Sequence, residues 1–350
     1  MMRRNISISN FHIVLITQTG VIYYFMETFS KNKVYVTRKI PEPGPSILKK
    51  YFQINMNPEP DILDRDTLLE NVKNVDALIC MLGDKVDSNV MDAAGPNLKI
   101  ISCYSVGYDH VDIYEATKRK IIVTNTPNVL ANTTADLTFS LILSAARNIV
   151  NADRHVRIGN WESGWSPDLF LGYDVNGSTL GIIGLGEIGT LVARRAKGFD
   201  MQVIYYSKTR KRQMESELDI TFVPLEELLR RSDFVSIHVL LNKDSFHMID
   251  ESKIKLMKKT AFIINTSRGQ VINEQHLINA LRNKVIAGAG LDVYESEPIS
   301  SSNPLTQFAQ TVLLPHIGSA TFKTRSKMAE VAANNIVNFF NGRGIVHKIN

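Results

Sequence analysis

At 350 residues, 44% of them apolar, the chain is long enough for two domains that each bury a core. Its formal net charge of +5 is small and its Lys and Arg residues are scattered, which argues against a nucleic-acid partner. The two cysteines both lie in apolar runs, so they exclude a disulfide framework and a cysteine-based zinc site and favour a reducing, cytoplasmic setting.

Residues 1–32 are expected to be an N-terminal extension. The two arginines in Met1-Met-Arg-Arg4 precede an apolar run at 11–25, which is the order of a secretory signal, but no small-residue cleavage site follows. The run is also too short and too polar to span a membrane, so no membrane association is predicted. We expect Met26 to be the natural start, with the preceding residues either disordered or wrongly assigned to the protein.

From Lys33 onward, short apolar segments alternate with helical ones. Strands are predicted at 33–37, 77–82, 99–103 and 121–123, with a turn at 41–45 and a short helix at 46–51. Such alternation predicts parallel strands that are covered by helices on both faces. The first half of the chain is therefore expected to be an α/β domain.

A long apolar helix is predicted at 131–149, followed by an irregular stretch at 158–167 that is rich in Gly, Trp and Pro. A second alternating series then begins, with strands expected at 179–183, 202–206, 234–238, 261–265 and 287–291. This pattern is typical of an open parallel sheet that binds a dinucleotide, and it indicates a second domain.

The turn after the 179–183 strand reads Gly184-Leu-Gly-Glu-Ile-Gly189 and lies between a predicted strand and a predicted helix. Gly184 allows the tight turn, Gly186 lets the backbone approach a pyrophosphate, and Gly189 lets the helix pack closely on the strand. The helix N-terminus presents N–H groups to the phosphates. We interpret the segment as a cofactor site; the alternative is a glycine turn without a ligand.

The strand that follows ends at Tyr206, where an NAD-specific site places an acidic residue on the ribose 2′-hydroxyl. In its place are two hydroxyl groups and two cations, from Ser207, Lys208, Thr209 and Arg210. Because these groups suit a 2′-phosphate, NADP(H) is predicted as the preferred cofactor, with NAD(H) still usable. The alternative is a solvated basic turn that continues into the next two residues.

Three residues with candidate chemistry follow later strands of this series. Arg268, Glu297 and His316 each come just after an apolar segment, at the sheet edge where open α/β sheets bind ligands. A guanidinium can bind a carboxylate through two hydrogen bonds, an imidazole can transfer a proton, and a nearby Glu favours the protonated imidazole. Each residue alone has a structural alternative, such as a surface ion pair or a cap, and no metal site is expected.

Four motifs together resemble the D-isomer-specific 2-hydroxyacid dehydrogenase family, most closely its glyoxylate and hydroxypyruvate reductases. They are 184–189, Asn265-Thr-Ser-Arg-Gly269, Gly290-Leu-Asp-Val-Tyr-Glu-Ser-Glu-Pro298 and Pro315-His-Ile-Gly-Ser-Ala320, and the resemblance extends over about 33–342. It implies that Arg268 binds the substrate carboxylate, that Glu297 holds His316, and that His316 is the acid/base.

The resemblance also implies the remaining contacts. Backbone groups of Val106 and Gly107 would bind the substrate, with Leu82 and Gly83 as a second lining. Asp292 would be the partner of the nicotinamide carboxamide. The cofactor contacts, beyond the 207–210 segment, would be Thr134, Leu185, Gly186, Glu187, Ile188, Thr266, Ser267, Arg268, Asp292, His316, Ile317 and Gly318.

The implied architecture is α/β, with two Rossmann-like or flavodoxin-like domains that have parallel sheets and an active site in the cleft between them. The substrate domain would comprise 33–131 and 321–350, including a final helix at 322–340, and the dinucleotide-binding domain would comprise 132–320. A dimerisation arm around 150–175 implies a homodimer. Trp161 or Trp165 of this arm would either approach a neighbouring active site or fill a small core of the arm.

The predicted function is hydride transfer from NADP(H) to a small 2-oxo acid, with His316 as the proton donor. The alternatives are a phosphite dehydrogenase and a non-catalytic, NAD(H)-sensing corepressor on the same fold. Absence of turnover with any 2-oxo acid would favour the corepressor over an enzyme.

Overall fold

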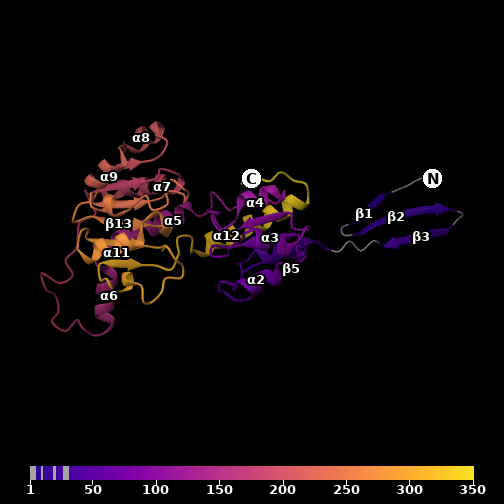
Figure 1. Cartoon of the computed structure of the whole chain (residues 1–350), viewed down its shortest axis with the longest axis horizontal. Coiled ribbons are helices and arrows are strands. Elements are labelled where there is room, and N and C mark those ends of the chain that lie inside the picture. The colour runs from indigo at the N-terminus through magenta and orange to yellow at the C-terminus, as the bar shows by residue number, and fades with distance from the viewer. Residues whose placement is uncertain (1–4, 9–10, 19–20, 27–30) are drawn as a thin grey trace. The chain divides into compact units, whose positions relative to one another are not determined.

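The computed structural model describes residues 5–8, 11–18, 21–26 and 31–350 (Figure 1). They divide into two compact units. Unit 1 has residues up to Tyr104, then Asp112–Thr124 and Ala329–Asn350, and unit 2 has Ser105–Val111 and Asn125–Met328. The predicted boundaries at 131/132 and 320/321 lie a few residues from the unit boundaries at 124/125 and 328/329, and the short segment 105–111 groups with unit 2. In the described part of the chain, no helix is both long and apolar enough to cross a membrane.

The N-terminal strands β1 (Asn5–Ile8), β2 (Phe11–Gln18) and β3 (Val21–Met26) form an antiparallel three-stranded sheet. The predicted extension at 1–32 includes these strands. It also includes residues 1–4, 9–10, 19–20 and 27–30, which lie outside the described residues. A start at Met26 stays a prediction.

Unit 1 contains a five-stranded parallel sheet of order β5-β4-β6-β7-β8, which is the flavodoxin-like order. Its strands are β4 (Lys33–Val36), β5 (Gln53–Met56), β6 (Ala77–Cys80), β7 (Ile100–Cys103) and β8 (Ile122–Thr124). Its helices are α1 (Gly44–Tyr51), α2 (Arg65–Asn71), α3 (Ser88–Ala94), α4 (Ile113–Lys118) and, from Ala329 onward, α12 (Phe322–Phe340).

Unit 2 contains a seven-stranded parallel sheet of order β11-β10-β9-β12-β13-β14-β15, which is the order of dinucleotide-binding folds. Its strands are β9 (Thr179–Ile183), β10 (Gln202–Tyr206), β11 (Thr221–Phe222), β12 (Phe234–Ile237), β13 (Phe262–Asn265), β14 (Gly288–Leu291) and β15 (Thr311–Leu313). Its α-helices are α5 (Ala131–Ala146), α6 (Ile149–Arg157), α7 (Glu187–Ala196), α8 (Arg212–Leu218), α9 (Leu225–Arg231), α10 (Glu251–Ile254) and α11 (Glu274–Arg282). Short 3₁₀ turns are η1 (Lys197–Phe199), η2 (Gly269–Val271) and η3 (Pro304–Gln307). The predicted α/β class with two parallel sheets is confirmed.

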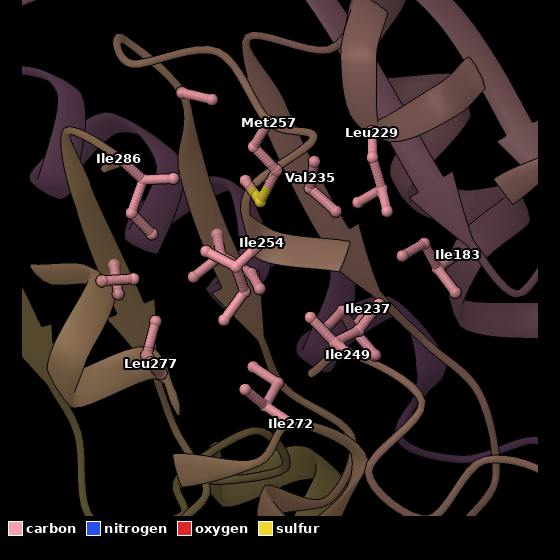
Figure 2. Packing of buried hydrophobic residues seen from close by; sticks show 14 of the residues in the cluster. Ile183, Leu229, Val235, Ile237, Ile249, Ile254, Met257, Ile272, Leu277 and Ile286 are labelled. Atoms are coloured by element: carbon pink, nitrogen blue, oxygen red, sulfur yellow. The ribbon is translucent and has the colours of Figure 1, made fainter. Parts of the chain in front are cut away.

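Successive side chains of the central strands of unit 2, such as β12, enter two cores, one on either face of the sheet. Val235 of β12 packs in the core under α9, α10 and α11, whereas its neighbour Phe234 packs in the core under α5 and α7. This alternation follows from the two-residue period of a strand. Figure 2 shows Leu229 and Leu277 from the helices on the same side of the sheet as Val235. Both faces are covered, so the edge where the parallel strands end is the part of this sheet that helices leave open, and open α/β sheets place ligands there.

The predicted helix at 131–149 was wrong at its C-terminal end. Helix α5 ends at Ala146, and α6 begins at Ile149 as a separate helix. Asn148 between them has a φ of 54°, a left-handed conformation that Asn tolerates better than most residues and that interrupts a right-handed helix. The apolar pattern continues through the break, so periodicity alone did not reveal it.

Candidate active site

Arg268 follows β13 and its guanidinium is held from two sides within unit 2. Nε donates to the Asp109 carboxylate at 3.0 and 3.2 Å, and Nη1 donates to the Ser267 carbonyl at 2.8 Å. Nη2 has no hydrogen-bond partner among residues 31–350, and a Cβ added to Gly107 would lie only 1.9 Å from it. Nη2 and the second N–H of Nη1 therefore remain as donors that an anion could bind.

The segment at 105–107 lies beside that guanidinium with its carbonyl groups already bound. Asn125 Nδ2 donates to the Val106 carbonyl at 2.8 Å, and Ser105 Oγ donates to the Gly107 carbonyl at 2.6 Å. The N–H groups of Val106 and Gly107 have no acceptor within the described ranges. A loop whose carbonyl groups already accept hydrogen bonds while its N–H groups have no acceptor suits an anionic ligand, as does the adjacent Arg268.

His316 and Glu297 form a direct pair. Nδ1 of His316 donates to Glu297 Oε2 at 2.7 Å, and the other carboxylate oxygen accepts the Tyr294 N–H at 3.0 Å. Burial alone would raise the pKa of the Glu297 carboxyl, but the His316 hydrogen bond and the charges of His316 and Arg268 offset burial, so the pKa lies below its ordinary value. Glu297 is thus ionised near neutral pH. Nε2 of His316 has no protein partner in the described structure and can exchange a proton with a ligand.

A buried carboxylate fixes the turn that carries His316. The two oxygens of Asp292 accept the N–H groups of Ile317 at 2.7 Å and Gly318 at 2.8 Å, and Thr134 Oγ1 donates to the Gly318 carbonyl at 3.1 Å. Burial raises the pKa of Asp292 even though these hydrogen bonds favour its charged form. The structure therefore brings four of the predicted cofactor contacts into one hydrogen-bonded group, which is anchored at the start of α5.

The turn at 266–268 is organised by Asn265, for which no role was predicted from the sequence. Its Oδ1 accepts the Ser267 N–H and hydroxyl at 3.0 Å each, and its Nδ2 donates to the Arg268 carbonyl at 2.9 Å. Thr266 lies within 3.1 Å of the Thr138 hydroxyl. An Asn at the end of an otherwise apolar strand is the sequence signal that could have identified this residue.

The glycine turn has the geometry that a pyrophosphate requires. Gly184 has a φ of +99°, and a Cβ on Gly189 would lie 2.1 Å from the Gly184 carbonyl oxygen. By contrast, a Cβ on Gly186 would have no neighbour within 4 Å, so this glycine borders open space. The first turn of α7 has no side-chain cap, which leaves its N–H groups available to an anion. Leu185 is buried, whereas Glu187 is exposed and Ile188 half-buried.

The cations predicted to bind a 2′-phosphate both have carboxylate partners. Arg210 donates from Nε and Nη2 to the two oxygens of Glu215, at 2.8 Å each, and this pair lowers the pKa of Glu215 to about 2. Lys208 Nζ lies 3.0 Å from an oxygen of Asp244. Ser207 and Thr209 form a tight turn through a 2.6 Å hydrogen bond. Neither ion pair was predicted from the sequence, because the carboxylates come from later segments.

His238 directly follows β12, next to the glycine turn. Its N–H donates to the Ile183 carbonyl at 2.7 Å, and its Nε2 lies 2.8 Å from the Ser236 hydroxyl. Burial lowers its pKa from 6.5 to about 3. The unfolded chain therefore binds a proton between these pH values that the folded chain does not bind. The stability that this histidine contributes is fully present above pH 6.5 and decreases as the pH falls toward 3.

We therefore predict that the acid sensitivity of folding depends on His238. The free energy of unfolding should fall by roughly 1.4 kcal/mol per pH unit through this one group, or about 2 kcal/mol between pH 6.5 and pH 5. Urea unfolding of the wild type and of His238→Asn, each at pH 7 and at pH 5, measures this change in the free energy of unfolding. The variant should lose about 2 kcal/mol less than the wild type over this interval, and equal losses would contradict the prediction.

Two predicted substrate contacts lie in unit 1. Leu82 and Gly83 follow β6 in a turn that Asp84 and Arg38 hold: Arg38 Nη2 donates to the Leu82 carbonyl at 2.6 Å, and Asp84 accepts the Met81 N–H at 2.7 Å. Gly83 has a φ of +93°. These hydrogen bonds fix the conformation of the turn. The Asp84 side chain that holds it is buried, and that of Arg38 is only 16% exposed.

The predicted dimerisation arm is the most apolar exposed part of unit 2. No residue of α6 is buried, and the side chains of Trp161 and Trp165 are 54% and 83% exposed. The two tryptophans therefore do not form a small core of the arm within one chain. Further exposed apolar residues of this region are Ile149, Val150, Val156, Ile158, Leu169, Leu171 and Tyr173.

The chain is similar in sequence and in fold to known proteins. The sequence model described as "D-isomer specific 2-hydroxyacid dehydrogenase, NAD binding domain" matches residues 139–318. A glyoxylate reductase of Thermococcus litoralis is 51% identical over 315 residues, which cover 89% of this chain and 95% of that protein. A glyoxylate reductase of Korarchaeum cryptofilum is 49% identical over 312 residues, which cover 89% and 94%.

A solved structure with the same fold is the NADPH-dependent glyoxylate/hydroxypyruvate reductase of Sinorhizobium meliloti in complex with NADP and malonate. Its TM-score is 0.80 at 30% identity, and the match covers 91% of this chain and 97% of that chain.

Proposed function

Because the chain belongs to the D-isomer-specific 2-hydroxyacid dehydrogenase family, we propose that it reduces glyoxylate or hydroxypyruvate to the 2-hydroxy acid, with NADP(H) as the preferred cofactor. It is an NAD(P)-dependent oxidoreductase that acts on a CH–OH group. The observation that carries the proposal is the hydrogen-bonded pair of His316 and Glu297, which lies at the same sheet edge as Arg268. The Nη2 atom of Arg268 has no protein acceptor in the described structure. NADPH oxidation on addition of either 2-oxo acid tests it.

The glycine turn and the start of α7 fit a dinucleotide. The open space at Gly186 and the uncapped N–H groups of α7 would receive the pyrophosphate, and Thr134 and Asp292 would border the nicotinamide. When bound, the reduced nicotinamide supplies the hydride for the carbonyl carbon of the substrate.

Arg268 would bind the substrate carboxylate through the Nη1 and Nη2 end of its guanidinium. Asp109 fixes the other edge, so the side chain loses little freedom when the substrate binds. The free N–H groups of Val106 and Gly107 would add hydrogen bonds to the same carboxylate, and Leu82 and Gly83 would line the remainder of the substrate site. These contacts orient the carbonyl group toward His316.

His316 would transfer a proton from Nε2 to the carbonyl oxygen as the 2-hydroxy acid forms. Glu297 accepts a hydrogen bond from Nδ1, which fixes the orientation of the ring and leaves Nε2 toward the ligand. In the reverse direction the same nitrogen would accept the proton of the hydroxyl group. In this arrangement Arg268 binds the substrate, His316 transfers the proton and Glu297 orients the imidazole.

The NADP(H) preference is supported by the absence of a carboxylate at Ser207, where it would repel a 2′-phosphate. We expect kcat/KM to be higher for NADPH than for NADH. Ser207→Asp should lower kcat/KM for NADPH by about tenfold or more, an effect of ~1.4 kcal/mol, with little change for NADH. Ser207→Asn, which adds similar volume without charge, is the control. A wild-type enzyme that uses NADH as well as or better than NADPH would refute the preference.

A homodimer formed through α6 and the arm is part of the proposal, supported by the exposed apolar side chains at 149–173. We expect sedimentation equilibrium to give the mass of two chains. The double variant Val156→Asp, Ile158→Asp should shift it to one chain, because an isolated carboxylate in an apolar interface lacks a partner. A wild-type monomer at all concentrations would contradict the proposal.

A cytoplasmic location is also part of the proposal. It is supported by Cys80 and Cys103, which are both buried as thiols and not joined in a disulfide.

A further inference from the structure

A second histidine–glutamate contact lies two residues from the first. His247 Nε2 is 2.6 Å from Glu295 Oε1, and Glu295 lies on the same loop as Glu297. His247 comes from the segment after β12, far from His316 in sequence. The loop after β14 thus contains two carboxylates that each bind an imidazole, and only the Glu297 pair is part of the proposed chemistry.

The hydrogen bonds around His247 determine which ring nitrogen carries the proton. Asn273 caps α11, and its Oδ1 accepts the His276 N–H at 3.0 Å, which leaves Nδ2 of Asn273 as the donor to His247 Nδ1 at 3.3 Å. Nδ1 is then an acceptor, so Nε2 bears the hydrogen and donates it to Glu295. His316 has the opposite arrangement, because its Nδ1 faces the carboxylate.

Glu295 connects three further segments. It exchanges hydrogen bonds with Glu274 at the start of α11: the Glu274 N–H donates to Glu295 Oε1 at 3.0 Å, and the Glu295 N–H donates to Glu274 Oε2 at 3.1 Å. Gln270 Nε2 donates to the Glu295 carbonyl at 2.7 Å. A Cβ on Gly269 would lie 1.9 Å from the Tyr294 carbonyl carbon, so the backbone after Arg268 touches the loop directly.

We propose that His247 and Glu295 are positioning residues that fix the loop after β14, so that Glu297 meets His316 and the loop stays in register with Arg268. Without the donor at His247, the side chain of Glu295 is bound only at α11, and the backbone between Glu295 and Glu297 gains freedom. The kinetic part of this inference rests on the proposed function, whereas the geometric part does not.

Two matched pairs of variants test it. His247→Leu removes the donor, and His247→Gln keeps an N–H near the position of Nε2. His247 has a φ of 50°, so both variants must adopt the same left-handed backbone and are matched in that respect. Glu295→Ala removes the acceptor, and Glu295→Gln keeps Oε1. We expect His247→Leu and Glu295→Ala to lower kcat for the 2-oxo acid by about tenfold or more, and the Gln variants to retain most of it. KM for the nicotinamide cofactor should change little.

One spectroscopic readout separates positioning from simple loss of stability. The downfield proton NMR signal of the His316 Nδ1–H group, assigned by its loss in His316→Asn, should shift or disappear in His247→Leu and Glu295→Ala. A lower Tm with an unchanged NMR signal would overturn the inference. Absence of wild-type turnover would refute the proposed function alone, because the NMR signal still decides the positioning role.

Discussion

His316→Ala is expected to lower kcat for glyoxylate reduction by about 10²–10⁴-fold, with KM for glyoxylate changed much less, because positioned proton transfer contributes that factor. In the structure, Nε2 is the ring nitrogen without a protein partner among the described residues, and Glu297 binds the other one. His316 does not hold the substrate carboxylate, so binding should persist. Steady-state kinetics at saturating NADPH measure the effect.

The backbone at His316 calls for a second variant. Its φ of 54° is left-handed, and Asn tolerates this conformation better than Ala does. His316→Asn should therefore fold at least as well and lose as much kcat. His347→Ala, which changes a histidine of unit 1 outside the proposed site, is the matched control. Activity of either His316 variant within about twofold of wild type, worth only ~0.4 kcal/mol, would show that His316 is not the acid.

Arg268→Ala is expected to raise KM and lower kcat for glyoxylate, by several kcal/mol in kcat/KM, on the order of a lost two-bond charge pair. The structure adds a second cause. Removal of the guanidinium leaves the Asp109 carboxylate without its partner, next to the place where the substrate carboxylate would lie. Arg268→Lys should recover little, since an ammonium lacks the planar fork.

The double variant Arg268→Ala, Asp109→Asn separates these two causes. It should recover part of the KM loss of Arg268→Ala, because the unpaired negative charge is gone, but little of the kcat loss, because substrate orientation is still missing. If Arg268→Ala alone keeps kcat/KM within about twofold of wild type, Arg268 does not bind the substrate.

Local patterns predicted most of the fold. Strands such as β9 and β10 are continuous apolar runs between polar segments, so their predicted bounds agree with the structure. β5 and β11 were not predicted, because both are short edge strands whose side chains are partly exposed and carry no apolar run. The end of α5 depends on one left-handed Asn, which periodicity does not encode.

The site was predictable only where a motif is continuous in sequence. The glycine turn and the Glu297 segment each contain their own signal, and the family resemblance supplied the pairing with His316. The partners that tune the site come from distant segments: Asp109 lies 159 residues from Arg268, and Asp244 lies 36 residues from Lys208. A single sequence contains no local sign of such contacts, so the Lys208–Asp244 and Arg268–Asp109 ion pairs required the structure. Glu215 lies only five residues from Arg210, but nothing in the sequence distinguishes this pairing from a cation that remains open to a phosphate.

The most direct test of the proposed function is the oxidation of NADPH by the purified wild-type protein, followed by absorbance, with glyoxylate, hydroxypyruvate and pyruvate as separate substrates. We expect steady turnover with glyoxylate or hydroxypyruvate and its loss in His316→Asn. No turnover with any of the three 2-oxo acids, with either NADPH or NADH, would contradict the proposed function and favour a cofactor-sensing protein on the same fold.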